Sequence, residues 1–175
     1  VFRNESGHLE ADFIVSSHST WCLLVVVDRH TRYVWIERIP NRKHAVVTRV
    51  FKRIIGDSSI QTITTDNDIA FSGWKQLEKV LHTKIYFCHP YHSWEKGTVE
   101  NTNGRIRRFL PKGKTLNNLT DSYLKRIENQ MNNTPRKCLK FRTPNEMLQL
   151  QINNLGALQV RMWLVFTLIV KYVII

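Results

Sequence analysis

Hydrophobic and polar positions in the first forty residues follow the periods of β-strands. From His8 to Val15 every second side chain is apolar, and the opposite side carries the carboxylates of Glu10 and Asp12. Residues Trp21 to Val27 form a continuous apolar run, as in a strand covered on both faces. After a short polar turn, Tyr33 to Ile39 has the composition of another strand. The pattern predicts a three-stranded meander.

Helical and strand periods alternate after Pro40. The elements predicted there are helices at residues 46–55, 74–81 and 120–133, strands at 60–65 and 84–88, and a helix whose first turn carries Glu100. A meander followed by such an alternation predicts the α/β class, with a mixed five-stranded sheet flanked by helices on both sides.

The segment from Tyr86 to Leu110 most needs a functional explanation. Its helix has an apolar stripe and, beside it, a carboxylate, an amide and a guanidinium at Glu100, Asn103 and Arg107. In the alternative interpretation, Glu100 only favours the helix dipole and the arginines form a solvated face. The helix alone does not decide between the two.

Composition narrows the choice of partner. The 175 residues suit one domain with a real core, and 26 Lys and Arg against 14 Asp and Glu give a net charge of +12. This excess predicts a polyanionic partner, with nucleic acid as the first candidate and an acidic membrane surface as the second. Three widely spaced cysteines form no CxxC pair, which favours a reducing cytoplasm over a disulfide framework or zinc ribbon.

Three carboxylates lie where ligands gather in α/β sheets. Asp12 is on the first strand, Asp66 ends the fourth, and Glu100 opens a helix. If the first and fourth strands pair, their two acids come side by side and the helix can cross over them. Clustered carboxylates repel one another unless a cation neutralises them. Mg²⁺ or Mn²⁺ suits such oxygen ligands, and two ions about 4 Å apart can act on both oxygens of a phosphodiester displacement.

Five segments of the chain resemble a known family. They are GHLEAD, TTDND followed by Phe71, PYHSWEKGTVENTNGRIRRF, PKG and NNTPRKCLKFRTPNE. In this order, from about Gly7 to Met147, they are similar to the catalytic domain of DDE-type insertion-sequence transposases of the IS-thirty-like branch. The 33 residues between Asp66 and Glu100 match the spacing in that branch. The resemblance implies a ribonuclease H-like fold, also described as retroviral-integrase-like.

The resemblance also implies roles for individual residues. Asp12, Asp66 and Glu100 correspond to the catalytic acids that bind Mg²⁺ or Mn²⁺, as two ions. Supporting positions near the site are Glu10, Asn67, Asn101, Asn103 and Trp94. A solvated strand face is the alternative for Glu10, and turn or helix hydrogen bonding is the alternative for the asparagines.

The chain departs from the family pattern at two positions. The family has Gly where this chain has Asp68, and Glu where it has Ala70. Glycine permits positive φ at such a turn, and Asp tolerates it better than most residues. We therefore expect the turn to survive, while the second acid beside Asp66 would perturb metal affinity.

Basic residues surround the Glu100 helix and follow the last predicted helix. Those assigned to DNA phosphates are Lys96, Arg105, Arg107, Arg108, Lys112, Lys114, Arg136 and Lys137, and Lys140 and Arg142 extend the second group. Simple solubility is the competing interpretation. Tyr91 and Trp94 are predicted either to stack on an unpaired base near the cut or to pack over the sheet edge.

The resulting hypothesis is a transposase catalytic core at residues 1–147, which hydrolyses DNA at element ends and transfers the strand into target DNA as a homo-oligomer. A catalytically dead DNA-binding remnant and a ribonuclease H-like nuclease without strand transfer are the alternatives. Val1 in place of Met suggests a fragment, and the resemblance implies an upstream helix-turn-helix region.

Residues 148–175 form a divergent apolar tail. Its last residues, MWLVFTLIVKYVII, fall short of the roughly 20 apolar residues that span a bilayer. A frameshifted or read-through end, a buried terminal strand and a membrane-associated segment are the three interpretations, and a membrane protein is the least favoured class.

Overall fold

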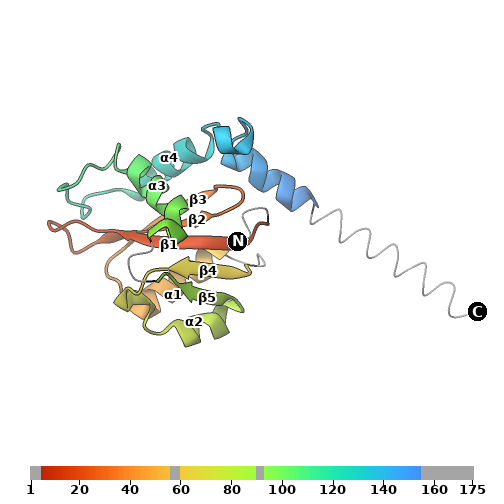
Figure 1. Cartoon of the computed structure of the whole chain (residues 1–175). Helices are drawn as coiled ribbons and strands as arrows, with labels where there is room; N and C mark the ends of the chain where they lie inside the picture. Colours follow the sequence, from red (N-terminus) through yellow and green to blue (C-terminus); the bar gives the residue numbers. More distant parts are fainter. Residues whose placement is uncertain (1–4, 56–59, 90–92, 155–175) are drawn as a thin grey trace, which may run out of the picture.

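A mixed five-stranded sheet lies between two layers of helices (Figure 1). The structure is a computed structural model, and it describes residues 5–55, 60–89 and 93–154. In the order β3-β2-β1-β4-β5, the strands are Val34–Ile39, Cys22–Asp28, His8–Ile14, Thr62–Thr65 and Lys84–Phe87. The first three pair antiparallel, while β4 is parallel to both β1 and β5. The predicted meander and the predicted five strands are confirmed.

Helices cover both faces of this sheet (Figure 1). Helices α1 (His44–Ile55) and α2 (Trp74–Leu81) lie on one side, and α3 (Gly97–Ile106) and α4 (Asp121–Asn132) lie on the other. Three short 3₁₀ turns, which the periodicity did not predict, are η1 (Ile69–Phe71), η2 (Ser93–Lys96) and η3 (Lys137–Leu139). A further helix occupies residues 144–154 and crosses the domain boundary expected at 147.

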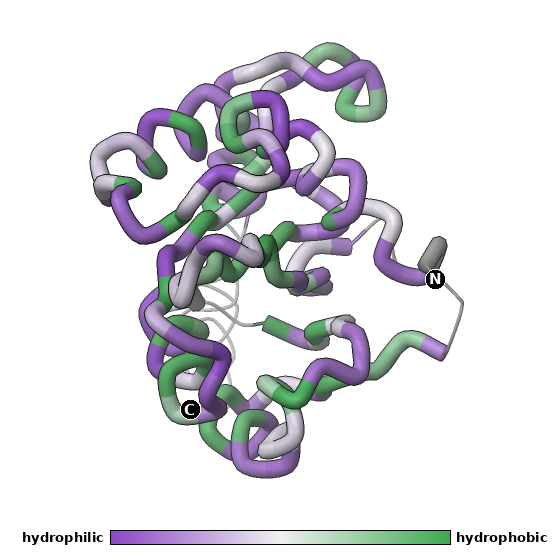
Figure 2. Tube along the Cα trace, turned by 90° about the vertical axis from the view of Figure 1, so that its left-hand side faces the viewer, coloured by the Kyte–Doolittle hydropathy of each residue, from purple (hydrophilic) through white to green (hydrophobic). Residues whose placement is uncertain are grey.

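The sheet separates two hydrophobic cores because successive side chains of a strand point to opposite faces. On β2, Leu24 and Val26 belong to the core with α1 and α2, whereas Leu23, Val25 and Val27 belong to the core with α3 and α4. In Figure 2, hydrophobic and hydrophilic positions alternate along the outer helices, as expected for helices that bury one side.

The parallel pairing of β1 and β4 determines where the site lies. Glu10 is opposite Thr64 in this ladder. Asp12 and Asp66 each follow two residues later in the chain, so they arrive at the same end of neighbouring strands. The expected pairing of the first and fourth strands is thereby confirmed.

Side chains of α4 hydrogen-bond to the backbone of β3, the strand at one edge of the sheet. The Val34 N–H donates to Asn132 Oδ1 at 2.9 Å, and Asn132 Nδ2 donates to the Val34 carbonyl at 2.8 Å. The Ile36 N–H donates to the buried carboxylate of Glu128 at 2.7 Å. Buried backbone groups need such partners, so these bonds hold α4 on the sheet.

The opposite edge of the sheet has a similar contact. There the N–H of Ile85 on β5 donates to Glu78 of α2 at 2.8 Å. At each edge of the sheet, a helix glutamate thus accepts a backbone hydrogen bond from the edge strand.

The apolar tail is largely outside the described residues, which end at 154. Its three interpretations therefore stay predictions. Among the helices that the structure describes, none has the length and apolar character needed to cross a membrane.

Candidate active site

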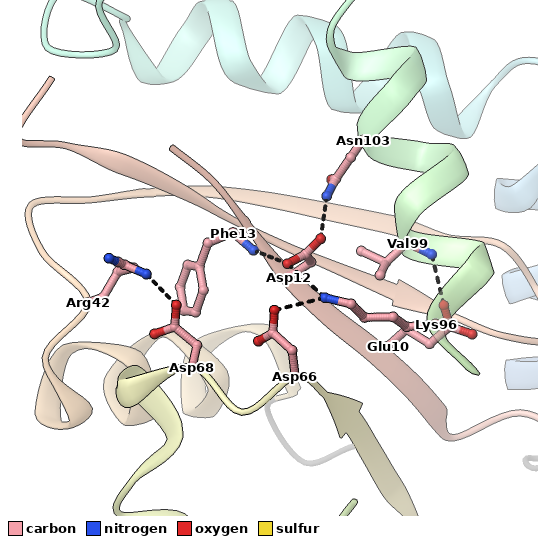
Figure 3. A network of polar contacts seen from close by, with 9 residues as sticks. All are labelled: Glu10, Asp12, Phe13, Arg42, Asp66, Asp68, Lys96, Val99 and Asn103. Atoms are coloured by element: carbon pink, nitrogen blue, oxygen red, sulfur yellow. Dashed lines mark hydrogen bonds and ion pairs between the residues drawn. The ribbon is translucent and has the colours of Figure 1, made fainter. Parts of the chain in front are cut away.

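Two carboxylates from neighbouring strands share one ammonium group (Figure 3). Lys96 Nζ lies 3.2 Å from Asp12 Oδ1 and 2.9 Å from Asp66 Oδ2. The exposed fraction of the side chain is 10% for Lys96, 19% for Asp12 and 44% for Asp66. Repulsion between the two acids is therefore offset by a cation of the chain itself, in a partly desolvated setting.

Lys96 stays protonated in this setting. Burial acts to lower its pKa, but the hydrogen bond to Asp66 and the negative charge of Asp12 outweigh burial, so the pKa of Lys96 is raised. Lys96 ends η2 and is the N-cap residue of α3, which places its side chain over the strand ends. From the sequence we predicted that Lys96 binds a DNA phosphate; its contact with both Asp12 and Asp66 was not predicted.

Asn103 of α3 completes this cluster from above the sheet (Figure 3). Its Nδ2 donates to Asp12 Oδ2 at 2.9 Å, while Asp12 Oδ1 also accepts from the Phe13 N–H at 2.9 Å. Asn103 Oδ1 and Asp66 Oδ1 are buried and have no hydrogen-bond partner within the described part of the chain. Uncharged and anionic oxygens left without donors are the ligands that a hard divalent cation prefers, so the donor set fits Mg²⁺ or Mn²⁺.

Glu100 does not share in these contacts. It is exposed on α3, one turn before Asn103, and so lies on the same flank of the helix. Across residues 5–55, 60–89 and 93–154, no three His, Cys, Asp or Glu side chains are grouped closely enough to hold a metal ion. The structure brings together Asp12 and Asp66, and the convergence of Glu100 with them stays a prediction.

Glu10 connects β1 to the start of α3. Its carboxylate is fully buried, lies 3.0 Å from Arg29 Nε, and accepts the Val99 N–H at 2.8 Å. Val99 is in the first turn of α3, where backbone N–H groups lack partners within the helix. The alternative of a solvated strand face for Glu10 is therefore wrong, and its contacts are those of a residue that positions α3 over the acids.

Asp68 faces away from the acid pair (Figure 3). Its carboxylate pairs with Arg42 and accepts the Ala70 N–H at 2.8 Å as the cap of η1. The φ of Asp68 is −68°, which any residue adopts. The turn therefore does not require the positive φ that the glycine of the family pattern would permit. Ala70 is fully buried in the core, and Asn67 is exposed.

The predicted DNA-binding residues fall into separate groups. Arg107 donates to the Val15 carbonyl at 2.9 Å, and Arg105 donates to Asn101 at 3.1 Å. Arg136 is buried, against the expectation of a surface contact. The exposed members are Arg108, Lys112, Lys114, Lys137, Lys140 and Arg142. Tyr91 and the side chain of Trp94 lie outside what the structure describes.

Comparison with known proteins adds a family context to this geometry. The sequence model of the family described as "Integrase core domain" matches residues 3–93, a stretch that includes Asp12 and Asp66 and stops before Glu100. The chain is 40% identical over 153 residues to a protein named transposase for insertion sequence element IS4351, from Bacteroides fragilis. It is 34% identical over 150 residues to transposase InsI for insertion sequence element IS30A, from Escherichia coli strain K12.

These alignments cover most of this chain but less than half of each relative. They span 86% of the chain and 47% of the IS4351 protein, and 84% of the chain and 39% of the IS30A protein. Among solved structures, a chain of the simian T-cell lymphotropic virus intasome, in complex with PP2A regulatory subunit B56 gamma, superposes with a TM-score of 0.65. That match has 19% identity and covers 80% of this chain and 53% of the other. It shows that the fold is the ribonuclease H-like fold of integrases.

Proposed function

The chain belongs to the integrase core domain family, with transposases of IS30-type insertion sequences among its relatives, and on this premise we propose that it is a transposase catalytic core. Its reaction is metal-dependent hydrolysis of a DNA phosphodiester at an element end, followed by transfer of the freed strand into target DNA. One observation carries the proposal: Asp12 and Asp66, from adjacent parallel strands, lie within 3.2 Å of a single cationic nitrogen.

Asp12, Asp66 and Glu100 are the residues that would hold the divalent ions in this proposal. Asp66 Oδ1 supports this assignment, because it is buried without a donor in the described part of the chain. When bound, Mg²⁺ or Mn²⁺ supplies Lewis-acid activation of water or a 3′-hydroxyl and stabilises the departing oxygen. Glu100 is on the flank of α3 that carries Asn103, so its convergence on the same site requires α3 or the Glu100 side chain to move.

Other side chains of the cluster prepare the acids. The Asn103 amide donates to Asp12 Oδ2 and so fixes the orientation of that carboxylate. Lys96 neutralises both carboxylates in the metal-free chain. Where divalent ions hold the acids, its ammonium would be available to pair with a phosphate oxygen of the DNA. In this way one lysine first prevents repulsion between the acids and afterwards prevents repulsion between acids and substrate.

DNA is the proposed partner, at the element end and at the target. The net charge of +12 and the exposed basic residues near the C-terminal end of α3 support this proposal. Homo-oligomer formation is part of it, because joining two ends of one element to one target needs two active sites.

A cleavage assay with a matched pair of variants tests the reaction. The protein is incubated with Mn²⁺ and a pre-nicked duplex that carries the inverted repeat flanking its own gene. We expect Asp66→Asn to abolish cleavage and strand transfer. Asp68→Asn, the same substitution two residues away, should retain both, because the Asp68 carboxylate is engaged by Arg42.

Each contrary outcome of the assay has a distinct meaning. Cleavage that persists in Asp66→Asn refutes the assignment of the acids. DNA binding without any metal-dependent cleavage by the unmodified chain indicates a dead remnant, and hydrolysis without joined products indicates a nuclease.

A further inference from the structure

A basic cavity, separate from the acid pair, lies on the flank of α3 that faces away from the acids. It is a cavity of about 460 Å³, and its lining includes Arg32, Thr98, Asn101, Arg105, Arg136 and Cys138. We propose that this cavity binds a backbone phosphate of DNA, at a distance from the reacting phosphodiester. The inference rests on the proposed function in one respect, which is that DNA is the partner.

The three arginines of this cavity lack a counter-charge. Among the residues that the structure describes, no Asp or Glu lines the cavity, and none of the three arginines pairs with a carboxylate. Their acceptors are neutral: Thr98 Oγ1 at 2.7 Å for Arg32, Asn101 Oδ1 at 3.1 Å for Arg105, and the Met131 carbonyl at 2.9 Å for Arg136.

Some of the other arginines are paired with carboxylates, and several arginines outside the cavity that are not, such as Arg49, Arg108 and Arg142, are exposed to solvent. Arg29, Arg38, Arg42 and Arg53 each have a carboxylate partner. What distinguishes the cavity is that three arginines without a carboxylate partner line one space, where an external anion could contact all of them.

Burial strengthens this argument. Arg136 is only 7% exposed, and the Nε of Arg32 is buried with no acceptor among the described residues. A buried guanidinium such as that of Arg136 is costly without an anion. Each guanidinium has five N–H donors, and the described residues accept from one nitrogen of each arginine. Phosphate is the anion that this arrangement fits, because the planar guanidinium fork pairs with two phosphate oxygens at once.

The position of the cavity separates it from the acid pair. At about 100° per residue, Thr98, Asn101 and Arg105 lie on the flank of α3 opposite to Glu100 and Asn103. Val99 and Ile106 are buried against the sheet between the two flanks. A phosphate in the cavity and a phosphate at the acids therefore belong to different nucleotides, so α3 would lie between two contacts with DNA.

Cys138 provides a reporter inside the cavity. It is exposed, whereas Cys22 and Cys88 are buried. Burial raises the pKa of the Cys22 thiol to about 11 and also raises the pKa of Cys88. Iodoacetamide at pH 7.5 should therefore alkylate Cys138 far faster than the other two thiols, and peptide mass spectrometry measures each rate.

The test measures alkylation of Cys138 with and without a 20-base-pair duplex in EDTA, while fluorescence anisotropy measures the fraction of protein bound. We expect saturating duplex at low salt to slow alkylation at least tenfold. Arg32→Asn and Arg105→Gln should each weaken this protection, and each should reduce the slope of log K against log salt by about one. Asparagine is chosen at position 32 because the φ there is +62° and Asn accepts that conformation.

Arg49→Gln is the matched control, since Arg49 is exposed on α1 across the sheet. It removes the same charge and should leave protection of Cys138 unchanged. Equal loss of protection in Arg49→Gln would indicate general electrostatics and overturn the assignment to the cavity.

Two further outcomes would overturn the proposal. In one, the duplex is bound but the alkylation rate of Cys138 does not change. In the other, protection without DNA rises with protein concentration, which would mean that an acidic group of a second copy occupies the cavity.

Failure of the cavity and failure of the proposed reaction remain distinguishable. Protection of Cys138 by a duplex that the protein does not cleave with Mn²⁺ supports the cavity and refutes the reaction. Cleavage without protection supports the reaction and refutes the cavity, and absence of any DNA binding refutes both.

Discussion

Replacement of Lys96 by methionine removes the cation that joins Asp12 and Asp66 while keeping a side chain of similar length. A hydrogen bond to a charged group contributes about 1.5–3 kcal/mol. The Asp66 side chain is 44% exposed, so its contact is reduced by solvent screening to about 0.5–1 kcal/mol. The contact with Asp12, which is 19% exposed, contributes about 1.5 kcal/mol. We expect Lys96→Met to lower the free energy of unfolding by about 2 kcal/mol in EDTA at neutral pH.

The same substitution should have the opposite effect on metal binding. At the proposed metal site of the unmodified chain, a divalent ion would have to displace the Lys96 ammonium from both carboxylates. Without that competitor, about 2 kcal/mol no longer opposes binding, which corresponds to a Mn²⁺ dissociation constant roughly thirtyfold lower. Mn²⁺ should then raise the unfolding temperature more in the variant than in the unmodified chain.

Urea unfolding in EDTA and calorimetric titration with Mn²⁺ measure the two effects separately. Lys79→Met is the control, because Lys79 is exposed on α2. This substitution removes the same charge at a position away from the acids. The reasoning fails if Lys96→Met unfolds at the same urea concentration as the control, or if it binds Mn²⁺ no more tightly than the unmodified chain.

Substitutions at three further positions test contacts near the acids and at the edge of the sheet. Glu10→Gln should cost about 3 kcal/mol in chemical unfolding, because it breaks a buried ion pair with Arg29; a loss below 1 kcal/mol would contradict this. Glu128→Ala leaves the Ile36 N–H without its acceptor and should cost about 2 kcal/mol, whereas Glu128→Gln, which keeps an acceptor, should cost less. Asp68→Asn should change stability by less than about 1 kcal/mol and leave Mn²⁺ affinity unaltered, since a partly exposed arginine pair is weak. A calorimetric titration showing altered Mn²⁺ affinity would mean that Asp68 contributes to the metal site.

The sheet was predictable because its strands bury one or both faces and so leave a period in the sequence. The run from Trp21 to Val27 is one such signal, and β2 has side chains in both cores. The short 3₁₀ turns left no comparable period, since three residues are too few to show one. The stripe of Val99, Thr102 and Ile106 predicted which side of α3 is buried.

The site was only partly predictable. Asp12 and Asp66 follow from strand order and family resemblance, and the register confirms that they are neighbours. A polar residue on a predicted strand is normally expected to face solvent, so the sequence did not predict the burial of Glu10. Its carboxylate is covered by α3 and accepts the N–H of a residue 89 positions further along the chain. The dual contact of Lys96 is equally non-local, because a lysine beside acids in space need not be beside them in sequence.

The two glutamates at the sheet margins bear on how copies of this chain can associate. An open strand margin is a template on which another polypeptide can add a strand, and crowding on one DNA molecule would favour that reaction. Here Glu128 and Asn132 accept hydrogen bonds from backbone N–H groups of β3, and Glu78 accepts one from β5. An incoming strand would first have to displace these carboxylate and amide side chains. If copies gather on DNA as proposed, these contacts would direct them to join through helices and loops, with their sheets kept apart.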